Sequence, residues 1–218
     1  MSKKTINTKN KWLDWAIKLQ ALSQAGLYYT DNEFERERYR EIRDIACEIL
    51  AEHSSVEIDE IHKYFTCDTG YKTPKMDSRA VCFKEDKLLL AQESDGKWSI
   101  PGGWIDIDQT LSQNLVKEAW EEAGAKVKPN FIIALHDWKT HASKKYTKLP
   151  FQICKVFVYC DIGSMDFHPN SETLQAEFFS KDNLPELSIG KNNYEQIDLC
   201  FKAHKAKKNG LMWEPVFD

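Results

Sequence analysis

The chain of 218 residues is 42% hydrophobic and 29% charged, and its formal net charge at pH 7 is −4. This length and composition allow one large domain, or a compact domain with a small accessory, and supply enough apolar residues to bury a core. The acidic balance argues against duplex nucleic acid as the main partner, because a basic surface that neutralises phosphates supplies most of the affinity for it.

Neither a membrane span nor a secretory signal is indicated by the hydropathy pattern. No stretch approaches the roughly 20 consecutive apolar residues that cross a bilayer, and the polar first residues lack an apolar signal segment. The six cysteines are scattered without a CxxC pair, which favours free thiols in a reducing compartment over a zinc site. We therefore expect a cytoplasmic protein with no membrane partner.

The N-terminal third has helical periodicity. A helix is predicted at 9–25 and is expected to stop before Gly26, and its apolar stripe consists of Trp12, Ala16, Leu19 and Leu22. A second amphipathic helix is predicted at 33–52, with an apolar face of Phe34, Ile42, Ile45, Ile49 and Leu50. A short helix at 59–65 precedes a linker at 66–77. These segments indicate a helical domain of residues 1–67, followed by a second domain of residues 68–218.

After the linker the hydrophobic period changes to that of strands. Strands at 79–84 and 87–92 are predicted to be joined by a tight turn at Glu85 and Asp86. The later predicted elements are an extended segment at 98–100, a helix at 111–123, strands at 131–138, 151–161 and 175–180, and a helix at 192–204. This order predicts an α/β fold in which helices cover a mixed sheet.

The most informative segment is residues 102–125, GGWIDIDQTLSQNLVKEAWEEAGA. The apolar residues of its helix that we expect to pack on the sheet are Leu111, Leu115, Ala119 and Ala123. Another face carries Glu118, Glu121 and Glu122 at i, i+3 and i+4, where like charges repel each other. Such a group of carboxylates suits a hard divalent cation, and the alternative is a solvated acidic face on a surface helix.

This segment resembles the Nudix box, G-x5-E-x7-R-E-U-x-E-E-x-G-U, where U is aliphatic. Counted from Gly103, the matching residues are Glu118, Ala119, Glu121, Glu122, Gly124 and Ala125. Two positions differ, because Gln109 replaces the glutamate of the pattern and Lys117 replaces its arginine. In the family these two residues form a salt bridge that braces the loop against the helix. The metal carboxylates are therefore retained here, whereas the brace is reduced to an amide and an ammonium group.

The resemblance extends to the N-terminal helices, the linker from Gly70 to Arg79 and the ending at 213–218. These segments are similar to a bacterial Nudix subfamily with an N-terminal helical domain, which includes ADP-ribose and CDP-choline pyrophosphatases. The resemblance implies an α/β/α sandwich, a homodimer to which the helical domain contributes, and a nucleoside diphosphate linked to a group X as substrate. It also implies Mg²⁺ or Mn²⁺ as cofactor and release of a nucleoside monophosphate and phosphorylated X.

Roles in metal binding and base catalysis are carried over onto the matching residues. Glu118 and Glu122 are the expected main metal ligands, with Glu121 as an additional ligand and the Gly103 carbonyl as a further candidate. Glu118 is the first candidate for the general base within the box. The candidates for this base outside the box are Glu172 and Glu177.

Substrate contacts are expected from basic and imidazole side chains near strand ends. Arg79 opens the first strand of the second domain and is a candidate for a phosphate contact, with a surface ion pair as the alternative. His136, Lys139 and His141 lie in or just after the 131–138 strand, where a polar loop is a suitable place for substrate contacts. The alternative is a solvated basic loop, to which Lys144, Lys145 and Lys148 add charge.

Two other functions stay open at this stage. One is a catalytically silent module that senses a nucleotide sugar, against which the complete set of box carboxylates argues. The other is a hydrolase that removes damaged nucleoside triphosphates, which the box alone does not distinguish. A helix-turn-helix at 36–65 is disfavoured because it lacks a basic face.

Overall fold

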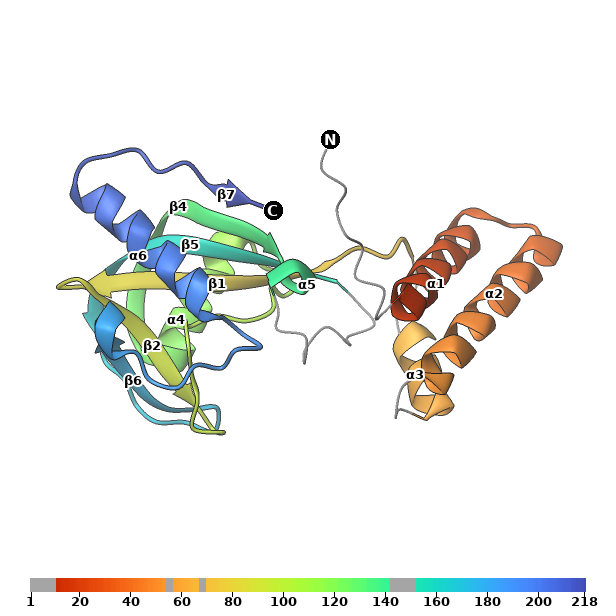
Figure 1. The fold of residues 1–218 in the computed structure, drawn as a ribbon, viewed down its shortest axis with the longest axis horizontal. Coiled ribbons are helices and arrows are strands. Elements are labelled where there is room, and N and C mark those ends of the chain that lie inside the picture. The colour runs from red at the N-terminus through yellow and green to blue at the C-terminus, as the bar shows by residue number, and fades with distance from the viewer. Residues whose placement is uncertain (1–10, 54–56, 67–69, 142–151) are drawn as a thin grey trace. The chain divides into compact units, whose positions relative to one another are not determined.

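A computed structural model describes residues 11–53, 57–66, 70–141 and 152–218 (Figure 1). Along the chain the structure divides into two compact units at Pro74 and Lys75. The boundary predicted between residues 67 and 68 lies a few residues before this division. Within the described ranges no helix is long and apolar enough to cross a membrane.

The first unit consists of the helices α1 (Lys11–Tyr29), α2 (Glu33–Glu52) and α3 (Ile58–Thr66). The side-chain oxygen of Asn32 caps α2 by accepting from the backbone N–H groups of Phe34 and Glu35. The three predicted helices are therefore present. Their common core consists of Leu13, Ala16, Ala46, Cys47, Leu50, Ile61 and Phe65.

The predicted stop of α1 at Gly26 is wrong, because the helix continues to Tyr29. A Cβ atom at Gly26 would lie 2.3 Å from Cζ of Tyr39, so this glycine makes room for the ring of a residue in α2. The predicted stripe is also partly wrong, since Leu22 is 56% exposed. The residues of α1 that are buried instead are Leu13, Ala16, Gln20, Ser23 and Gln24.

The buried face of α2 differs in part from the predicted one. Phe34 is 76% exposed and Ile45 is 45% exposed, whereas Ala46, Cys47 and Leu50 are buried. The predicted face is therefore right at Ile49 and Leu50, which lie in or against the core, and wrong at Phe34 and Ile45.

The second unit is built on one mixed sheet. Its strands are β1 (Lys75–Lys84), β2 (Lys87–Glu93), β3 (Trp98–Ser99), β4 (Ala125–Asp137), β5 (Ile153–Met165), β6 (Thr173–Phe179) and β7 (Val216–Phe217). The strand order is β3-β2-β1-β5-β4-β7, and β6 pairs antiparallel with β2 outside this order. β1 and β5 are parallel, while β4 and β5 are antiparallel. This arrangement confirms the predicted mixed sheet.

The helical elements of this unit are α4 (Leu111–Ala123), the short α5 (Trp138–His141), the 3-10 turn η2 (Lys181–Asn183) and α6 (Tyr194–Lys208). Glu85 and Asp86 have positive φ angles of 50° and 61°, which confirms the tight turn between β1 and β2. Trp138 belongs to α5 rather than to the preceding strand, because Oδ1 of Asp137 accepts from the N–H groups that begin this turn.

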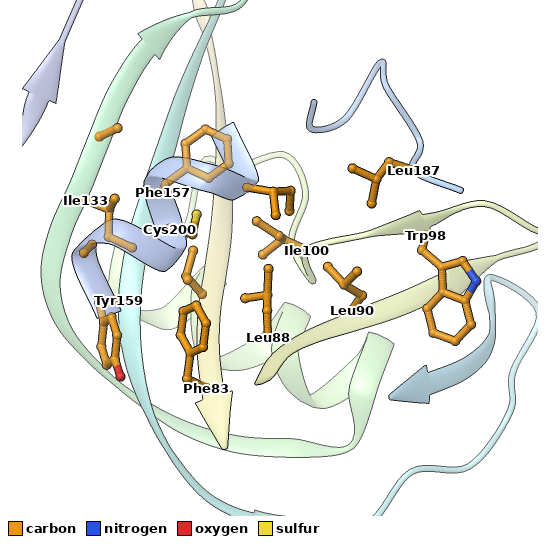
Figure 2. Packing of buried hydrophobic residues seen from close by; sticks show 14 residues of the cluster. Phe83, Leu88, Leu90, Trp98, Ile100, Ile133, Phe157, Tyr159, Leu187 and Cys200 are labelled. Carbon is orange, nitrogen blue, oxygen red and sulfur yellow. The ribbon is translucent and has the colours of Figure 1, made fainter. Parts of the chain in front are cut away.

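The two faces of the sheet carry separate cores. On one face Leu115, Ala119 and Ala123 of α4 pack with Ala80 and Val158 of the strands. On the other face Ile197 and Cys200 of α6 meet residues such as Phe83, Leu88 and Phe157 (Figure 2). The unit is thus an α/β fold with a mixed sheet between helices, as predicted.

The five cysteines in the described ranges are free: Cys47, Cys82, Cys154, Cys160 and Cys200.

Candidate functional site

A glycine turn at 101–103 lies directly against β1. The N–H of Ser78 donates to the carbonyl of Gly103 at 2.9 Å, and the N–H of Ala80 donates to that of Pro101 at 2.8 Å. Gly102 has a φ of 145°, and a Cβ atom there would lie 1.9 Å from the carbonyl oxygen of Ser78. Only glycine therefore allows the turn to pair this closely with the strand.

Helix α4 is held at both ends and along its inner side. Thr110 and Gln113 form a capping box at its start, and Gly124 ends it in the left-handed conformation with φ 59°. On the inner side the Asn114 amide donates to the Ser78 hydroxyl at 2.9 Å. The bond to Ser78 ties the helix to the strand that holds the glycine turn.

Glu122 extends from α4 to this turn. Its Oε2 accepts from the N–H of Gly102 at 2.8 Å. Burial raises the pKa of Glu122 to about 7, although the nearby Arg79 guanidinium and the Gly102 N–H act in the opposite direction. A cation beside such a carboxylate would stabilise its ionised form.

Glu118 lies on the same side of α4, one turn earlier. A Cβ atom on Gly103 would be 3.0 Å from Glu118 Oε2, so the carboxylate lies close against the turn. Burial raises the pKa of Glu118, and the neighbouring Lys117 opposes this shift. Glu118 and Glu122 therefore both lie against the glycine turn.

Glu121 is placed differently, because its side chain is 56% exposed. In the parts of the chain that the structure describes, no group of three or more His, Cys, Asp or Glu side chains is assembled closely enough to hold a metal ion. The Gly103 carbonyl already accepts one hydrogen bond from Ser78, which leaves its second lone pair. The structure thus brings two of the three predicted carboxylates together.

This pair fits a hard divalent cation by its donor chemistry. Both side chains offer carboxylate oxygens, which Mg²⁺ and similar ions prefer. Burial of both groups penalises their ionised forms, and a positive ion between them would offset that penalty.

The loop that leads to α4 is connected to it through Lys117. The Lys117 ammonium donates to Asp106 Oδ2 at 3.0 Å and lies 3.6 Å from Glu118 Oε1. The hydrogen bond to Asp106 makes the largest contribution to raising the pKa of Lys117. Gln109, which occupies the family position for the partner, has a buried Oε1 with no hydrogen bond from a described residue. Asp106 was not predicted from the sequence, because the family pattern assigns no role to that loop position.

Arg79 is an interior residue with 2% exposure. Its Nε and Nη2 donate to the two carboxylate oxygens of Asp77 at 2.8 and 2.5 Å. The alternative of a surface ion pair is therefore wrong, since the pair is buried on one face of β1. The ammonium of Lys155 lies 3.8 Å from Asp77 Oδ1, and Lys155 is also almost fully buried. Burial and the nearby Arg79 lower the pKa of Lys155 to about 7.

The residue before the glycine turn is held by two side chains distant in sequence. The N–H of Ile100 donates to Asn192 Oδ1 at 2.8 Å, and its carbonyl accepts from Arg79 Nη1 at 3.1 Å. Lys155 donates to the carbonyls of Gly190 and Lys191, close to Asn192 in the chain. Neither Asn192 nor Lys155 was predicted from the sequence as a residue of the site. A lysine within the apolar run of β5 was the available signal for Lys155.

His136 and His141 lie together, in a cavity whose lining includes neither Glu118 nor Glu122. Their rings stack with centroids 3.9 Å apart, and they line a cavity of about 500 Å³ together with α6 residues such as Tyr194 and Lys202. Burial and the neighbouring His141 lower the pKa of His136. His136 is thus a buried residue rather than part of a solvated loop.

The remaining predicted site residues are more exposed. Lys139 is half-buried in α5, and Glu172 and Glu177 are exposed at β6 and just before it. Lys144, Lys145 and Lys148 lie outside the described residues.

Two models of known protein families match this chain, one over the helical unit and one over the sheet unit. A family model described as "NUDIX domain" matches residues 74–200. A second model, described as "UDP-X-like, N-terminal oligomerisation domain", matches residues 10–65.

Similar proteins cover nearly the whole chain. The protein named "Putative ADP-ribose pyrophosphatase YjhB" of Bacillus subtilis (strain 168) is 34% identical over 93% of this chain and 98% of its own. The crystal structure of a UDP-X diphosphatase is 26% identical, covers 96% of this chain and 98% of its own, and has a TM-score of 0.60. That of an ADP-ribose pyrophosphatase from Streptococcus suis 89-1591 is 44% identical, covers 67% of this chain and all of its own, and also has a TM-score of 0.60.

Proposed function

The chain belongs to the Nudix hydrolase family, and from this membership we propose that it is a metal-dependent pyrophosphohydrolase acting on a nucleoside diphosphate linked to a group X. Cleavage of the diphosphate releases a nucleoside monophosphate and phosphorylated X. The observation that carries the proposal is the placement of Glu118 and Glu122 against the 102–103 turn, with the Gly102 N–H bonded to Glu122.

The substrate class is supported by similarity over both units. A relative named as an ADP-ribose pyrophosphatase and a solved UDP-X diphosphatase each align over more than nine-tenths of this chain. Both names denote a nucleoside diphosphate with a second group attached. ADP-ribose and other X-linked nucleoside diphosphates are therefore the first substrates to examine, and a damaged nucleoside triphosphate is the alternative.

Glu118 and Glu122 would hold the divalent cation, with Glu121 and the Gly103 carbonyl as additional ligands. A bound Mg²⁺ or Mn²⁺ supplies neutralisation of the diphosphate oxygens and activation of the attacking water. The Gly102 N–H orients the Glu122 carboxylate through the bond between them. Glu118 is the first candidate to accept the proton of the water, and Glu172 and Glu177 are the candidates outside the helix.

Substrate contacts are assigned to the basic residues at the strand ends. Arg79 lies in the interior and acts on the site through the Ile100 carbonyl and through its charge near Glu122. A phosphate would have to reach the guanidinium edges not used by Asp77. His136, Lys139 and His141 are proposed to contact the group X or the base.

The similarity of the helical unit to an oligomerisation domain supports a homodimer.

The decisive experiment incubates the protein with Mg²⁺ or Mn²⁺ and ADP-ribose, a UDP-sugar, CDP-choline, NADH or an oxidised nucleoside triphosphate. Release of a nucleoside monophosphate from one of the first four is the expected result. Release of inorganic diphosphate from the triphosphate alone would instead identify a hydrolase of damaged nucleotides. Tight nucleotide binding without turnover would indicate a silent sensor.

The assignment of the carboxylates has its own test. Glu122→Gln is expected to abolish metal-dependent turnover while the circular dichroism spectrum stays unchanged, because the amide keeps the shape but loses the charge. Glu48→Gln, at an exposed position of α2, is the matched control and should keep full activity. A Glu122→Gln enzyme with a near wild-type rate would contradict the assignment.

A further inference from the structure

The inner side of α2 is cationic in its first half. Arg36, Arg40 and Arg43 follow one another at i, i+4 and i+7, and the same stripe continues through the buried Cys47 and Leu50. A helix that packs on its neighbours normally carries apolar residues along such a stripe. Here three arginine side chains take those positions and are 32%, 48% and 23% exposed, so this end of the stripe is polar and partly open to solvent.

These arginines line a cavity of about 280 Å³ within the helical unit. The opposite walls are formed by Leu27 and Tyr28 of α1 and by Phe65 of α3. The cavity thus combines three cationic side chains with two aromatic rings. Its described lining residues all belong to the first unit and include none of the carboxylates of α4.

One of the three arginines has a clear structural role. Nη1 of Arg36 donates to the carbonyls of Leu27 at 2.9 Å and Thr30 at 3.0 Å, which lie at the end of α1. These two bonds explain the position of Arg36, because its guanidinium satisfies carbonyl groups that the end of the helix leaves without partners.

Arg40 and Arg43 have no comparable partners among the described residues. The carboxylate oxygens nearest to them are at 3.8 Å, from Glu33 to Arg40, and at 3.9 Å, from Asp44 to Arg43. These separations exceed those of hydrogen bonds. Nε of Arg43 is buried and has no hydrogen-bond acceptor in the described parts of the chain. Burying a guanidinium donor without an acceptor is costly.

We propose that this cavity is an anion-binding site, in which Arg40 and Arg43 bind a phosphate or diphosphate group of a small molecule. The planar guanidinium fork matches the oxygens of such a group, and the resulting charge-assisted hydrogen bonds satisfy the donors that the protein leaves free. Tyr28, which is 60% exposed, offers apolar surface to the part of the molecule attached to the phosphate. The site is additional to the proposed catalytic one and does not depend on it.

The test measures binding of inorganic phosphate and inorganic diphosphate to the full-length protein by isothermal titration calorimetry. EDTA is present, so that anions do not bind through a divalent metal. Saturable binding is expected for the wild type. Arg43→Gln and Arg40→Gln should each weaken it by roughly ten- to a hundredfold, because each removes charge-assisted hydrogen bonds.

Arg38→Gln is the matched control, since Arg38 is an exposed arginine on the same helix outside the stripe. It should leave the affinity unchanged, as should Glu122→Gln. If circular dichroism shows that Arg43→Gln does not fold, Arg43→Lys takes its place in the test. This variant keeps the positive charge and is expected to weaken binding because it loses the planar guanidinium group.

Each of the following outcomes would overturn the proposal. They are absence of saturable binding, equal binding by the Arg40→Gln and Arg43→Gln variants and the wild type, or an equal loss in Arg38→Gln. A change of oligomeric mass in Arg43→Gln without any phosphate binding would also overturn it, and would assign these arginines to contacts between subunits.

Discussion

At the scale of single residues, burial and neighbouring charges shift the pKa values of the ionisable side chains in and near the site. Glu122 is a buried carboxylate whose hydrogen-bond donor is the backbone of the turn, and Arg79 and Lys155 share one aspartate on the opposite face of β1. Such groups are costly in an interior unless each has a partner. Two ion pairs, Lys117–Asp106 and Lys155–Asp77, give predictions for individual side chains.

The first concerns the connection between the loop and α4. Asp106→Asn should raise the Mg²⁺ concentration for half-maximal activity, because it weakens the contact between Lys117 and the loop. The increase should be at most about fivefold, since exposed ion pairs contribute little free energy. Gln109→Ala should have almost no effect. Gln109→Glu in the Asp106→Asn background should restore the wild-type value, since it returns the family's acidic residue. An effect of Gln109→Ala larger than that of Asp106→Asn would refute this role.

The second concerns the pH dependence of stability. The charged and polar groups that face Lys155 are Asp77, Arg79, Glu93, Lys191 and the carbonyl of Gly190. Because burial lowers the pKa of Lys155 to about 7, the unfolded chain binds one more proton than the folded chain between pH 7 and the usual lysine pKa. Stability from this group is therefore gained as the pH rises through that window, with a slope of up to about 1.4 kcal/mol per pH unit.

Lys155→Met should remove this gain, which is measurable by urea denaturation at pH 6.5, 8 and 9.5 without metal. The free energy of unfolding of the variant should change less over this range than that of the wild type. Lys128→Met, at an exposed position of β4, is the comparison. Identical pH profiles of the Lys155→Met variant and the wild type would show that Lys155 titrates normally.

At the scale of elements, the site is made by packing one helix and one turn on the same strand. The Asn114–Ser78 bond holds α4 to β1, and the backbone bonds of Ser78 and Ala80 hold the 101–103 turn to the same strand. The sequence predicted α4 with the correct bounds, because its cap residues, apolar spacing and terminal glycine are all local signals. It did not predict that Asn192 and Arg79 hold Ile100, since the residues concerned are distant in sequence.

The turn itself can be tested with a pair of glycines. Gly102→Ala should lower the free energy of unfolding by at least about 2 kcal/mol more than Gly96→Ala, because overpacking adds to the strain of a positive φ angle. Both glycines have positive φ, but only Gly102 has a neighbour that a Cβ atom would meet. Chemical denaturation measures the difference. Equal losses in the two variants would show that backbone strain alone explains the effect.

At the scale of the whole molecule, the chain combines a helical unit and a sheet unit. The helical unit exposes large apolar side chains, among them Trp15 at 59% and Leu22 at 56%. Exposed apolar surface on a unit similar to an oligomerisation domain is expected to be covered by a second subunit.

Light scattering coupled to gel filtration should therefore give the mass of a dimer. Leu22→Glu should shift it toward the monomer, because a charge in an apolar contact is costly. Met212→Glu, which changes a 93% exposed residue of the other unit, should leave the mass unchanged. A monomeric wild type, or a dimer insensitive to Leu22→Glu, would contradict this.

Local sequence patterns by themselves determined the fold class, the three N-terminal helices, α4 and the family, because caps, periodicity and a spaced motif are read within one element. Only the tertiary structure decided which sides of α1 and α2 are buried, that Arg79 pairs with Asp77 in the interior, and that Lys117 binds Asp106 instead of Gln109. The stripe of Arg36, Arg40 and Arg43 was not predicted from the sequence, and only the packing of the helices shows that these residues line a cavity. The reason is physical: burial and partner choice depend on which elements meet in space, and charged side chains lie inside only where a partner or a ligand offsets their loss of water.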